Sequence, residues 1–288
     1  MQFDAAAIAG ELAASEPYFI SDEGRFAMGT SANRYVTYAI ALTQNLSVYV
    51  SNTGSNSNDG LSAATAFQTI QHAVTVLRTR YSLCGYTAII NIADGTYLEN
   101  VVMGSVTGGV VRFVGSTSAI WRNTTGWLLF VNGAAAVEVS GLTLGGAGTV
   151  NGIITIDRGF CNFLGGHVFG AMTGSHIAVT RNGVSIVSGN YSITGGGYSH
   201  YGIFDGGQLF ITSITATLTG VPAFTGSFAN VGRVGSINGG ENVFTFSGAA
   251  TGPRYGINAN GVIWVNGKGQ NVFPGSVAGF ILTGGSYS

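Results

Sequence analysis

Alternating apolar and polar residues recur along the chain at a nearly constant interval, each time beside a turn-forming pair that ends in glycine. The stretches are FVNGAAAVEV, TIDRGFCNFL, VTRNGVSIVS, IFDGGQLFIT, FANVGRVGSI and INANGVIWVN. Their pairs are Asn132-Gly133, Arg158-Gly159, Asn182-Gly183, Gly206-Gly207, Val231-Gly232 and Asn260-Gly261. The glycines are 26, 24, 24, 25 and 29 residues apart. Period-two alternation predicts strands, and a repeat of this length without a helix predicts a solenoid of stacked strands, a parallel β-helix.

The first 46 residues do not follow this repeat. Within them, Tyr18-Phe19-Ile20 and Arg25-Phe26-Ala27-Met28 flank the four residues Ser21-Asp22-Glu23-Gly24. Two short apolar runs around a turn-rich tetrapeptide predict a hairpin. A segment of this size cannot bury a core alone, so we expect it to dock on a partner.

A helix is predicted after the first strand of the repeat region. From Thr65 onward apolar residues fall at helical spacing, and Ser62 or Thr65 is available as the N-cap. The apolar positions are Phe67, Ile70, Ala73, Val74 and Leu77. Because exposed end strands invite pairing with other chains, we expect this helix to cap a β-helix spanning residues 47–250. Residues 251–288 are expected to close the other end.

The composition suits stacked coils. Glycine supplies 47 of the 288 residues, and 8% of residues are charged while 45% are hydrophobic. Charges repeated on every coil would repel one another at a strand spacing of about 4.8 Å, whereas Asn, Ser and Thr can hydrogen-bond along the stack. The net charge is −1 and no cluster of Lys and Arg is present. Nucleic acid is therefore not an expected partner.

Several classes of protein and site are not expected. The opening MQFDAAAIAGELAASEP carries acidic residues and no basic n-region, so no signal peptide is predicted. No apolar run reaches the length of about 20 residues that spans a bilayer, so we expect no membrane insertion. Cys84 and Cys161 fall in different elements, and a disulfide is not expected. The loop around Asp59 lacks the several carboxylates of a calcium loop, so no metal or cofactor is expected.

Three stretches resemble known proteins. VYVSNTGSNSNDGLSAATAFQTIQHAV with IINIADGTYLENV is similar to the opening of pectin-lyase-like right-handed β-helix proteins. GEL with FISDEGRFAMGT resembles the N-terminal segment of phage and prophage tail fibres, and PRYGINANGVIWVNGKGQNVFPGSVAGFILTGGSYS resembles the ending of small prophage tailspike-like proteins. The resemblance implies a homotrimer of right-handed parallel β-helices on a phage tail, attached to other tail or baseplate proteins through residues 1–46. Release of virions by lysis would account for the missing signal peptide.

Three charged residues share one position relative to the repeat glycine. Asp157, Arg181 and Asp205 each stand two residues before it, so we expect them to stack on successive coils. The two carboxylates would then lie about 10 Å apart, near the separation of about 6.5–9.5 Å in inverting glycosidases. This makes Asp157 and Asp205 the candidate catalytic acids. Arg181 between them would keep both ionised, which favours a structural ladder or a sugar-binding row over catalysis.

Aromatic residues form a second candidate surface. Tyr198, Tyr201 and Phe204 fall within two coils, beside His200. Aromatic faces stack on sugar rings, so these four residues and Arg181 are the predicted ligand-binding residues, with an intersubunit contact as the alternative. His176 and His200 share a column seven residues before their glycines and are expected at the surface. The tryptophans are expected in the core or at interfaces: Trp121, Trp127 and Trp264.

These observations predict an all-β, trimeric, right-handed parallel β-helix of a phage tail that binds a glycan of the host cell surface. The main alternative is a depolymerase that cleaves this glycan as a hydrolase or a lyase. A third possibility is a structural virion protein without a ligand. Of the 12 acidic residues, at least six lie outside the coils, which favours binding over catalysis.

Overall fold

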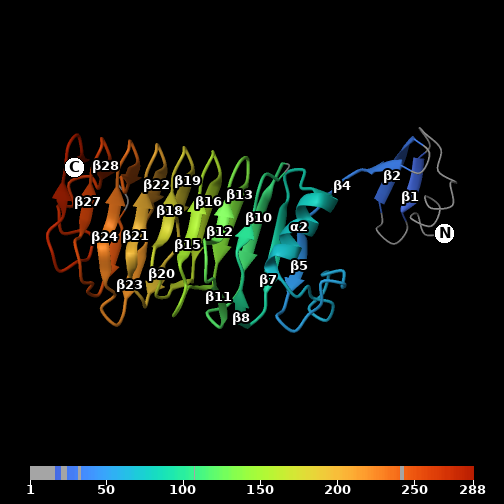
Figure 1. Ribbon diagram of the computed structural model, residues 1–288, viewed down its shortest axis with the longest axis horizontal. Coiled ribbons are helices and arrows are strands. Elements are labelled where there is room, and N and C mark those ends of the chain that lie inside the picture. Colours follow the sequence, from blue (N-terminus) through green and yellow to red (C-terminus); the bar gives the residue numbers. More distant parts are fainter. Residues whose placement is uncertain (1–16, 21–24, 32–33, 107, 241–242) are drawn as a thin grey trace.

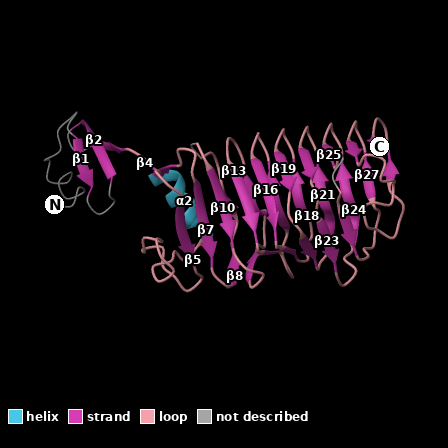
Figure 2. Ribbon diagram, turned by 180° about the vertical axis from the view of Figure 1, so that it is seen from behind, coloured by secondary structure: helices cyan, strands magenta, loops and turns pink. Residues whose placement is uncertain are grey.

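The computed structural model describes residues 17–20, 25–31, 34–106, 108–240 and 243–288. Its main body is a right-handed parallel β-solenoid of about 8 turns, and the described part of the chain contains a single helix. Figure 1 shows the coils stacked side by side along the long axis, and Figure 2 shows the same stack from behind. The predicted β-helix is confirmed.

Three parallel sheets form the sides of the solenoid. The first has 10 strands: β5 (Leu46–Val50), β7 (Thr87–Ile92), β10 (Val110–Val114), β13 (Ala136–Ser140), β16 (Phe160–Gly165), β19 (Val184–Val187), β22 (Gln208–Ile211), β25 (Ser236–Asn238), β28 (Val262–Trp264) and β30 (Ser286–Tyr287). The second has seven: β8 (Gly95–Leu98), β11 (Ala119–Arg122), β14 (Thr143–Leu144), β17 (Val168–Phe169), β20 (Tyr191–Ile193), β23 (Thr215–Leu218) and β26 (Thr245–Ser247). The third has eight: β9 (Val101–Val102), β12 (Trp127–Val131), β15 (Asn151–Thr155), β18 (Ser175–Val179), β21 (Gly197–Ile203), β24 (Phe224–Val231), β27 (Tyr255–Ile257) and β29 (Phe280–Ile281).

Identical positions of successive coils stack into rows that fill the interior. In the first sheet, Val111 pairs with Val137 and Val137 with Cys161, and all three side chains are fully buried. Burial alternates along these strands, as period-two patterning requires. The small thiol of Cys161 therefore serves as part of the apolar core.

The repeat glycines mark the turn from the third sheet to the first. Gly159, Gly183 and Gly207 occupy the same place in successive coils, since each carbonyl accepts a hydrogen bond from the residue that opens the next coil's first-sheet strand. A Cβ at Gly183 would lie 2.3 Å from the Thr155 carbonyl oxygen, and one at Gly207 2.3 Å from that of Val179. Glycine is needed here because neighbouring coils approach too closely for a side chain.

Two of the six predicted turn pairs are misplaced. Val231 of the Val231-Gly232 pair is the last residue of β24 and is fully buried, and the turn follows at Arg233-Val234 before Gly235. Asn132-Gly133 is displaced in the same way, because Ala135 rather than Gly133 precedes the next strand. The Arg233-Val234 turn has positive φ angles of 48° and 64° at residues that do not favour them, so local sequence gives little sign of it.

Helix α2 (Ile70–Arg80) lies at the N-terminal end of the stack and contacts β5, β7 and β9. Thr69 is its N-cap rather than Ser62 or Thr65, and its hydroxyl accepts a hydrogen bond from the His72 amide at 3.2 Å. Four apolar residues of the helix are buried: Ile70, Ala73, Val74 and Leu77. The role of the helix as a cap stays a prediction.

The two ends of the chain differ in architecture. β1 (Pro17–Ile20) and β2 (Arg25–Ser31) pair antiparallel as the predicted hairpin, and β3 (Arg34–Thr37) extends them to three strands. The hairpin loop lies outside the described residues. β4 (Ile40–Ala41) pairs in parallel with β6 (Tyr81–Ser82). At the other end the sheets continue through residues 251–288, where β27 to β30 add further rungs.

Candidate functional site

A column of alternating acids and bases runs along the repeat turn. Asp157, Arg181, Asp205 and Arg233 occupy the same position in four successive turns, and all four have φ angles near +50°. An Arg181 Nη2 donates to Asp157 Oδ2 at 3.0 Å, and Arg233 Nε donates to Asp205 Oδ1 at 2.5 Å. The predicted stacking of Asp157, Arg181 and Asp205 holds. Arg233 is a fourth member that the misplaced Val231-Gly232 pair concealed.

This column gives neither aspartate the environment of a general acid. Each carboxylate is paired with its own guanidinium, and Asp205 also accepts a hydrogen bond from Thr180 Oγ1 at 2.9 Å. The hydrogen bond from Arg233 is the main cause that lowers the pKa of Asp205 below its ordinary value. A general acid needs the opposite shift, because it must hold a proton at neutral pH.

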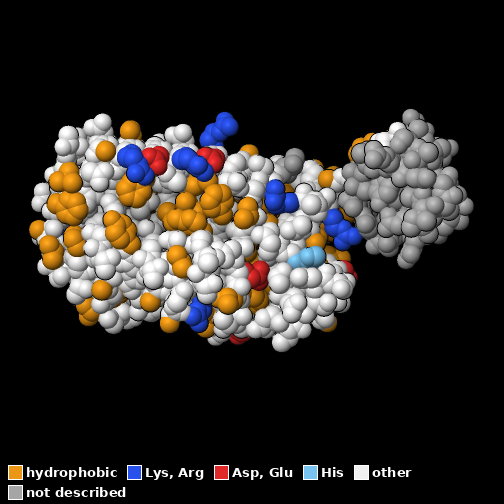
Figure 3. Space-filling view, in the orientation of Figure 1, with side chains coloured by type: hydrophobic (Ala, Val, Ile, Leu, Met, Phe, Trp, Pro, Cys, Tyr) orange, Lys and Arg blue, Asp and Glu red, His pale blue; other side chains and the backbone are white. Residues whose placement is uncertain are grey.

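A groove opens beside the column, on the outer face of the third sheet. It has a volume of about 450 Å³ and draws its lining from β12, β15, β18, β21 and the turn after β24. The lining residues are Trp127, Asn151, Ile154, Thr173, Gly174, Ser175, Ala178, Thr180, Tyr198, Gly202, Phe204 and Arg233. Figure 3 shows hydrophobic side chains gathered on this face, below two adjacent pairs of oppositely charged side chains.

Small residues make the floor of the groove and aromatic residues make its walls. Ile154, Ala178 and Gly202 pair in register on β15, β18 and β21, so side-chain size falls along one outward row. Tyr198 is 48% exposed and its ring lies over Gly226, where a Cβ would come within 2.6 Å of the ring. The Phe204 ring carries the Arg233 guanidinium 5.0 Å from its centroid. The result is an apolar hollow with one charged rim.

Hydroxyl groups supply the polar atoms of the groove. Ser175 and Ser199 stand in register on β18 and β21, and their Oγ atoms are 2.8 Å apart. Thr180 is already engaged with Asp205. Because Ser199 is fully buried, a ligand in this groove would meet the hydroxyls of Thr173, Ser175 and Thr180, the Asn151 amide and the Arg233 guanidinium.

The predicted ligand-binding residues lie in three different places. Tyr198 and Phe204 line the groove, and Arg181 lies in the adjacent charged column without lining it. His200 and Tyr201 are fully buried inside the solenoid, so their predicted place on the surface is wrong. The buried residues of β21 form an almost unbroken run, so alternation does not reveal which side chains point inward.

His176 and His200 do share a column, but it lies in the core. Their Nδ1 atoms are 2.9 Å apart and both side chains are 0% exposed. Their expected place at the surface is therefore wrong. Within the described residues, no three His, Cys, Asp or Glu side chains come together as metal ligands.

Trp127 is not among the predicted ligand-binding residues, because it was expected in the core or at an interface. It is half-buried and lines the groove. Its spacing from Tyr198 and Phe204 carries no repeat signal, since Trp127 is the first residue of β12, whereas Tyr198 is the second residue of β21 and Phe204 follows the end of β21. Of the other tryptophans, Trp121 is fully buried and Trp264 is 40% exposed.

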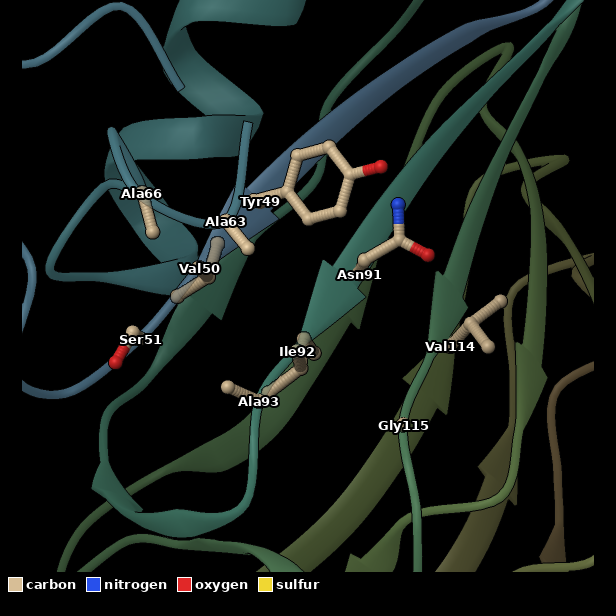
Figure 4. Close-up of a pocket in the computed structure, with 10 residues that line it drawn as sticks. All are labelled: Tyr49, Val50, Ser51, Ala63, Ala66, Asn91, Ile92, Ala93, Val114 and Gly115. Atoms are coloured by element: carbon tan, nitrogen blue, oxygen red, sulfur yellow. The ribbon is translucent and has the colours of Figure 1, made fainter. Parts of the chain in front are cut away.

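A second hollow lies near the N-terminal end, over the first sheet. Tyr49, Asn91 and Val114 stand in register on β5, β7 and β10, and Ala63 and Ala66 of the following loop face them (Figure 4). Its volume is about 240 Å³. The Asn91 amide donates to the Val48 carbonyl at 3.3 Å. This hollow is smaller, has one aromatic wall and no charged group.

Two further acidic side chains, Glu138 and Asp59, have structural partners. Glu138 pairs with Arg112 at 2.6 Å across the outer face of the first sheet. Asp59 accepts hydrogen bonds from the Leu61 amide and the Thr65 hydroxyl at 2.9 Å and 2.6 Å. Asp59 therefore stabilises its loop. Glu241 lies outside the described residues.

No protein-family model matches the chain, and neither a curated protein nor a solved structure shows significant similarity to it. Across the described residues, no helix has the length and apolar character needed to cross a membrane. The geometry of the groove is thus the main basis for a functional proposal.

Proposed function

We propose that the chain is a carbohydrate-binding solenoid that holds a cell-surface glycan in the groove of the third sheet. The observation that carries this proposal is the wall of three aromatic side chains, Trp127, Tyr198 and Phe204, around an apolar floor. Pyranose rings present C–H faces to aromatic rings and hydroxyls to polar groups. The Ser175 hydroxyl and the Arg233 guanidinium, which both line the groove, supply polar groups for the second role.

The length of the groove suits an oligosaccharide. Its lining comes from four successive third-sheet strands and from the turn after the fifth. At about 4.8 Å per coil this spans roughly 15–20 Å, the length of several sugar units. A polymer lying across the coils would meet the aromatic walls in turn.

Binding without cleavage is the better-supported activity. Asp157 and Asp205 are each held by an arginine, and the lowered pKa of Asp205 keeps it ionised at neutral pH. Neither aspartate, nor any other carboxylate of the described residues, lines the groove. A hydrolase would need one protonated and one ionised carboxyl group across the sugar bond.

The resemblance of both chain ends to phage tail proteins supports a place for this binding. We propose a trimeric fibre or tailspike of a virion, attached through residues 1–46 to other tail proteins, with residues 251–288 closing the stem. Adsorption to the surface polysaccharide of a bacterial host would then be the role of the groove.

The test is binding of the purified full chain to a panel of bacterial surface polysaccharides, by calorimetry or glycan array. The variants Tyr198→Ala and Trp127→Ala should each weaken binding by tenfold or more, since each removes an aromatic stacking surface of the groove. Tyr86→Ala is the matched control, because Tyr86 is 37% exposed on the loop before β7, away from the groove.

Three results would contradict the proposal that the groove binds a glycan without cleaving it. Equal binding by the groove variants and the control would place the ligand elsewhere. New reducing ends or unsaturated sugars in the product would show a depolymerase. Absence of any binding across the panel would favour a structural virion protein.

A further inference from the structure

The solenoid interior behind the groove holds a cluster of polar rings, which we call the inner cluster: His167, His176, Tyr191, His200 and Tyr201. The Nδ1 atoms of His176 and His200 are 2.9 Å apart, and His200 Nε2 lies 2.8 Å from the Tyr191 hydroxyl. The Tyr191 and Tyr201 hydroxyls are 2.6 Å apart. These contacts join four of the five side chains into one hydrogen-bonded chain.

The fifth member, His167, is buried without such a contact. Its ring stacks on Tyr191 with a centroid distance of 5.5 Å, and neither ring nitrogen has a hydrogen-bond partner among the described residues. It is 1% exposed. The imidazole is held mainly by ring contacts with Tyr191, Phe163 and Phe169, beside the backbone of Gly165.

Among the residues that the structure describes, no charged side chain balances a proton in the inner cluster. The titratable groups that face the three imidazoles are the imidazoles themselves, Tyr191 of β20 and Tyr201 of β21. The other rings packed against them are apolar: Phe163 of β16, Phe169 of β17, and Phe224 and Phe228 of β24. A histidinium here would be a buried charge without a counter-ion, which is costly.

The His176–His200 contact limits the cluster further. One proton between the two Nδ1 atoms makes a hydrogen bond, whereas a proton on each atom would place two N–H donors face to face at 2.9 Å. The cluster is therefore compatible with neutral imidazoles and not with two charged ones.

The same strands carry the inner cluster on one side and the groove on the other. On β18, His176 points into the core while its neighbours Ser175 and Ala178 line the groove. On β21, His200 is buried while Gly202 lines the groove. If β18 and β21 separate because the core between them is disrupted, the floor of the groove is lost as well.

We propose that the inner cluster makes the coils that carry the groove the acid-labile part of the solenoid, so that mild acid opens these coils and releases the bound ligand. The release step rests on the proposed carbohydrate function, whereas the opening step does not. The rest of the solenoid stays folded under the same conditions, since it holds one histidine, His72 of helix α2 at the N-terminal end of the stack, and that side chain is only partly buried.

The direction of the effect follows from linkage. Burial lowers the pKa of His167 and of His176 to about 4, and burial with the neighbouring imidazoles lowers that of His200 well below its usual value. The unfolded or opened chain, with pKa values near 6.5, takes up protons first as the pH falls. Stability of these coils is therefore full above about pH 6.5 and falls from there to about pH 4. When the pH falls from 7 to 5, each histidine raises the equilibrium constant for opening by about 20-fold, and the three together raise it by about 10⁴-fold.

The experiment is hydrogen exchange of the full chain at pH 7 and pH 5, corrected for the intrinsic pH dependence of exchange and resolved by peptide. We expect the equilibrium constant for opening to rise by 10³-fold or more in β18 and β21 at pH 5, and by less than tenfold in β7 and β10. His167→Phe should make this rise in β18 and β21 about 20-fold smaller, and it adds no polar group to the core. His72→Gln should leave the rise unchanged. Resonances of the four histidines, followed by NMR, should all titrate below pH 6.5, since partial burial lowers the pKa of His72 as well, with His167, His176 and His200 lowest.

Uniform exchange along the solenoid, or an unchanged response in His167→Phe, would overturn the proposal. If His167→Phe does not fold, His176→Phe with its ring between Phe169 and Phe224 gives the same comparison. Where a glycan binds at pH 7, loss of tenfold or more in affinity at pH 5 supports release, and equal affinity refutes it. If no glycan binds at all, the proposed function fails while the exchange data still decide the acid lability.

Discussion

Replacing Gly183 by alanine should destabilise the solenoid through contact between two backbones. The added Cβ would lie 2.3 Å from the Thr155 carbonyl oxygen, 2.6 Å from its carbon and 2.9 Å from the Ile156 nitrogen. All three are backbone atoms, so no rotation of a side chain can make room. Gly183 does not have a positive φ, so the backbone conformation itself would accept alanine. The contact is the whole effect.

The magnitude follows from the movement that alanine would force. Reaching ordinary contact requires the two coils to part by about 1 Å at this turn. The hydrogen bonds from Val184 N to Gly159 O and from Asp157 N to Arg181 O, both 3.0 Å, link the coils there. Weakening both costs about 1–3 kcal/mol, and overpacking adds about 1–3 kcal/mol, so we expect a loss of about 3 kcal/mol.

The assay is urea unfolding together with hydrogen exchange of the amides in β16 and β19. Gly202→Ala is the matched control, because its Cβ would meet the Ser175 and Ser199 hydroxyls at 3.0 Å and 3.3 Å, and both can rotate away. We expect the control to lose less than about 1 kcal/mol. Equal stability of Gly183→Ala and Gly202→Ala would refute the argument that coil spacing dictates this glycine column.

Three further changes probe other parts of the fold. Thr69→Ala removes the N-cap of helix α2 and should cost about 1 kcal/mol in urea unfolding; no loss would show that the helix end needs no cap. Arg233→Gln should raise the pKa of Asp205 in an NMR titration, because the main hydrogen bond that lowers it is gone. Since that pKa is lowered in the fold, ionised Asp205 stabilises the protein above its unfolded value near 3.8, and this contribution disappears as the pH falls through the lower folded value. Phe228→Ala should cost about 3–5 kcal/mol, because the ring is fully buried among other aromatic rings, whereas Phe204→Ala at the groove should change the free energy of unfolding far less.

The fold was predictable because the repeat expresses a physical constraint. Gly183 and Gly207 recur where backbones touch, and 24-residue spacing between them measures one coil. One of the two misplaced turns lies in a longer coil: from Gly207 to Gly235 the spacing is 28 residues, and the turn is made by Arg233 and Val234. Nothing in the local preferences of these two residues marks a turn.

The candidate site was predictable only in part. Alignment to the repeat placed His176 and His200 in one column, and their contact shows that the column is real. It could not say whether the column faces inward, because third-sheet strands such as β15 and β18 are buried on nearly every residue. The groove depends on the sizes of residues in neighbouring coils, such as Ala178 beside Gly202, and that information is absent from any single stretch of sequence.

The alternating column in the turns has a consequence for how the coils find their order. Coils of similar length carry nearly interchangeable backbone ladders, so a folding chain can pair two coils that are not neighbours. If one coil were skipped, Asp157 would meet Asp205, or Arg181 would meet Arg233, and like charges would face each other at the distance now occupied by an ion pair. When a coil pairs with its correct neighbour, side chains of opposite charge meet in the turn. When one coil is left out, side chains of equal charge meet. The four surface charges therefore disfavour pairing of the wrong coils. Because they lie outside the solenoid, they do so without affecting the packing of the core.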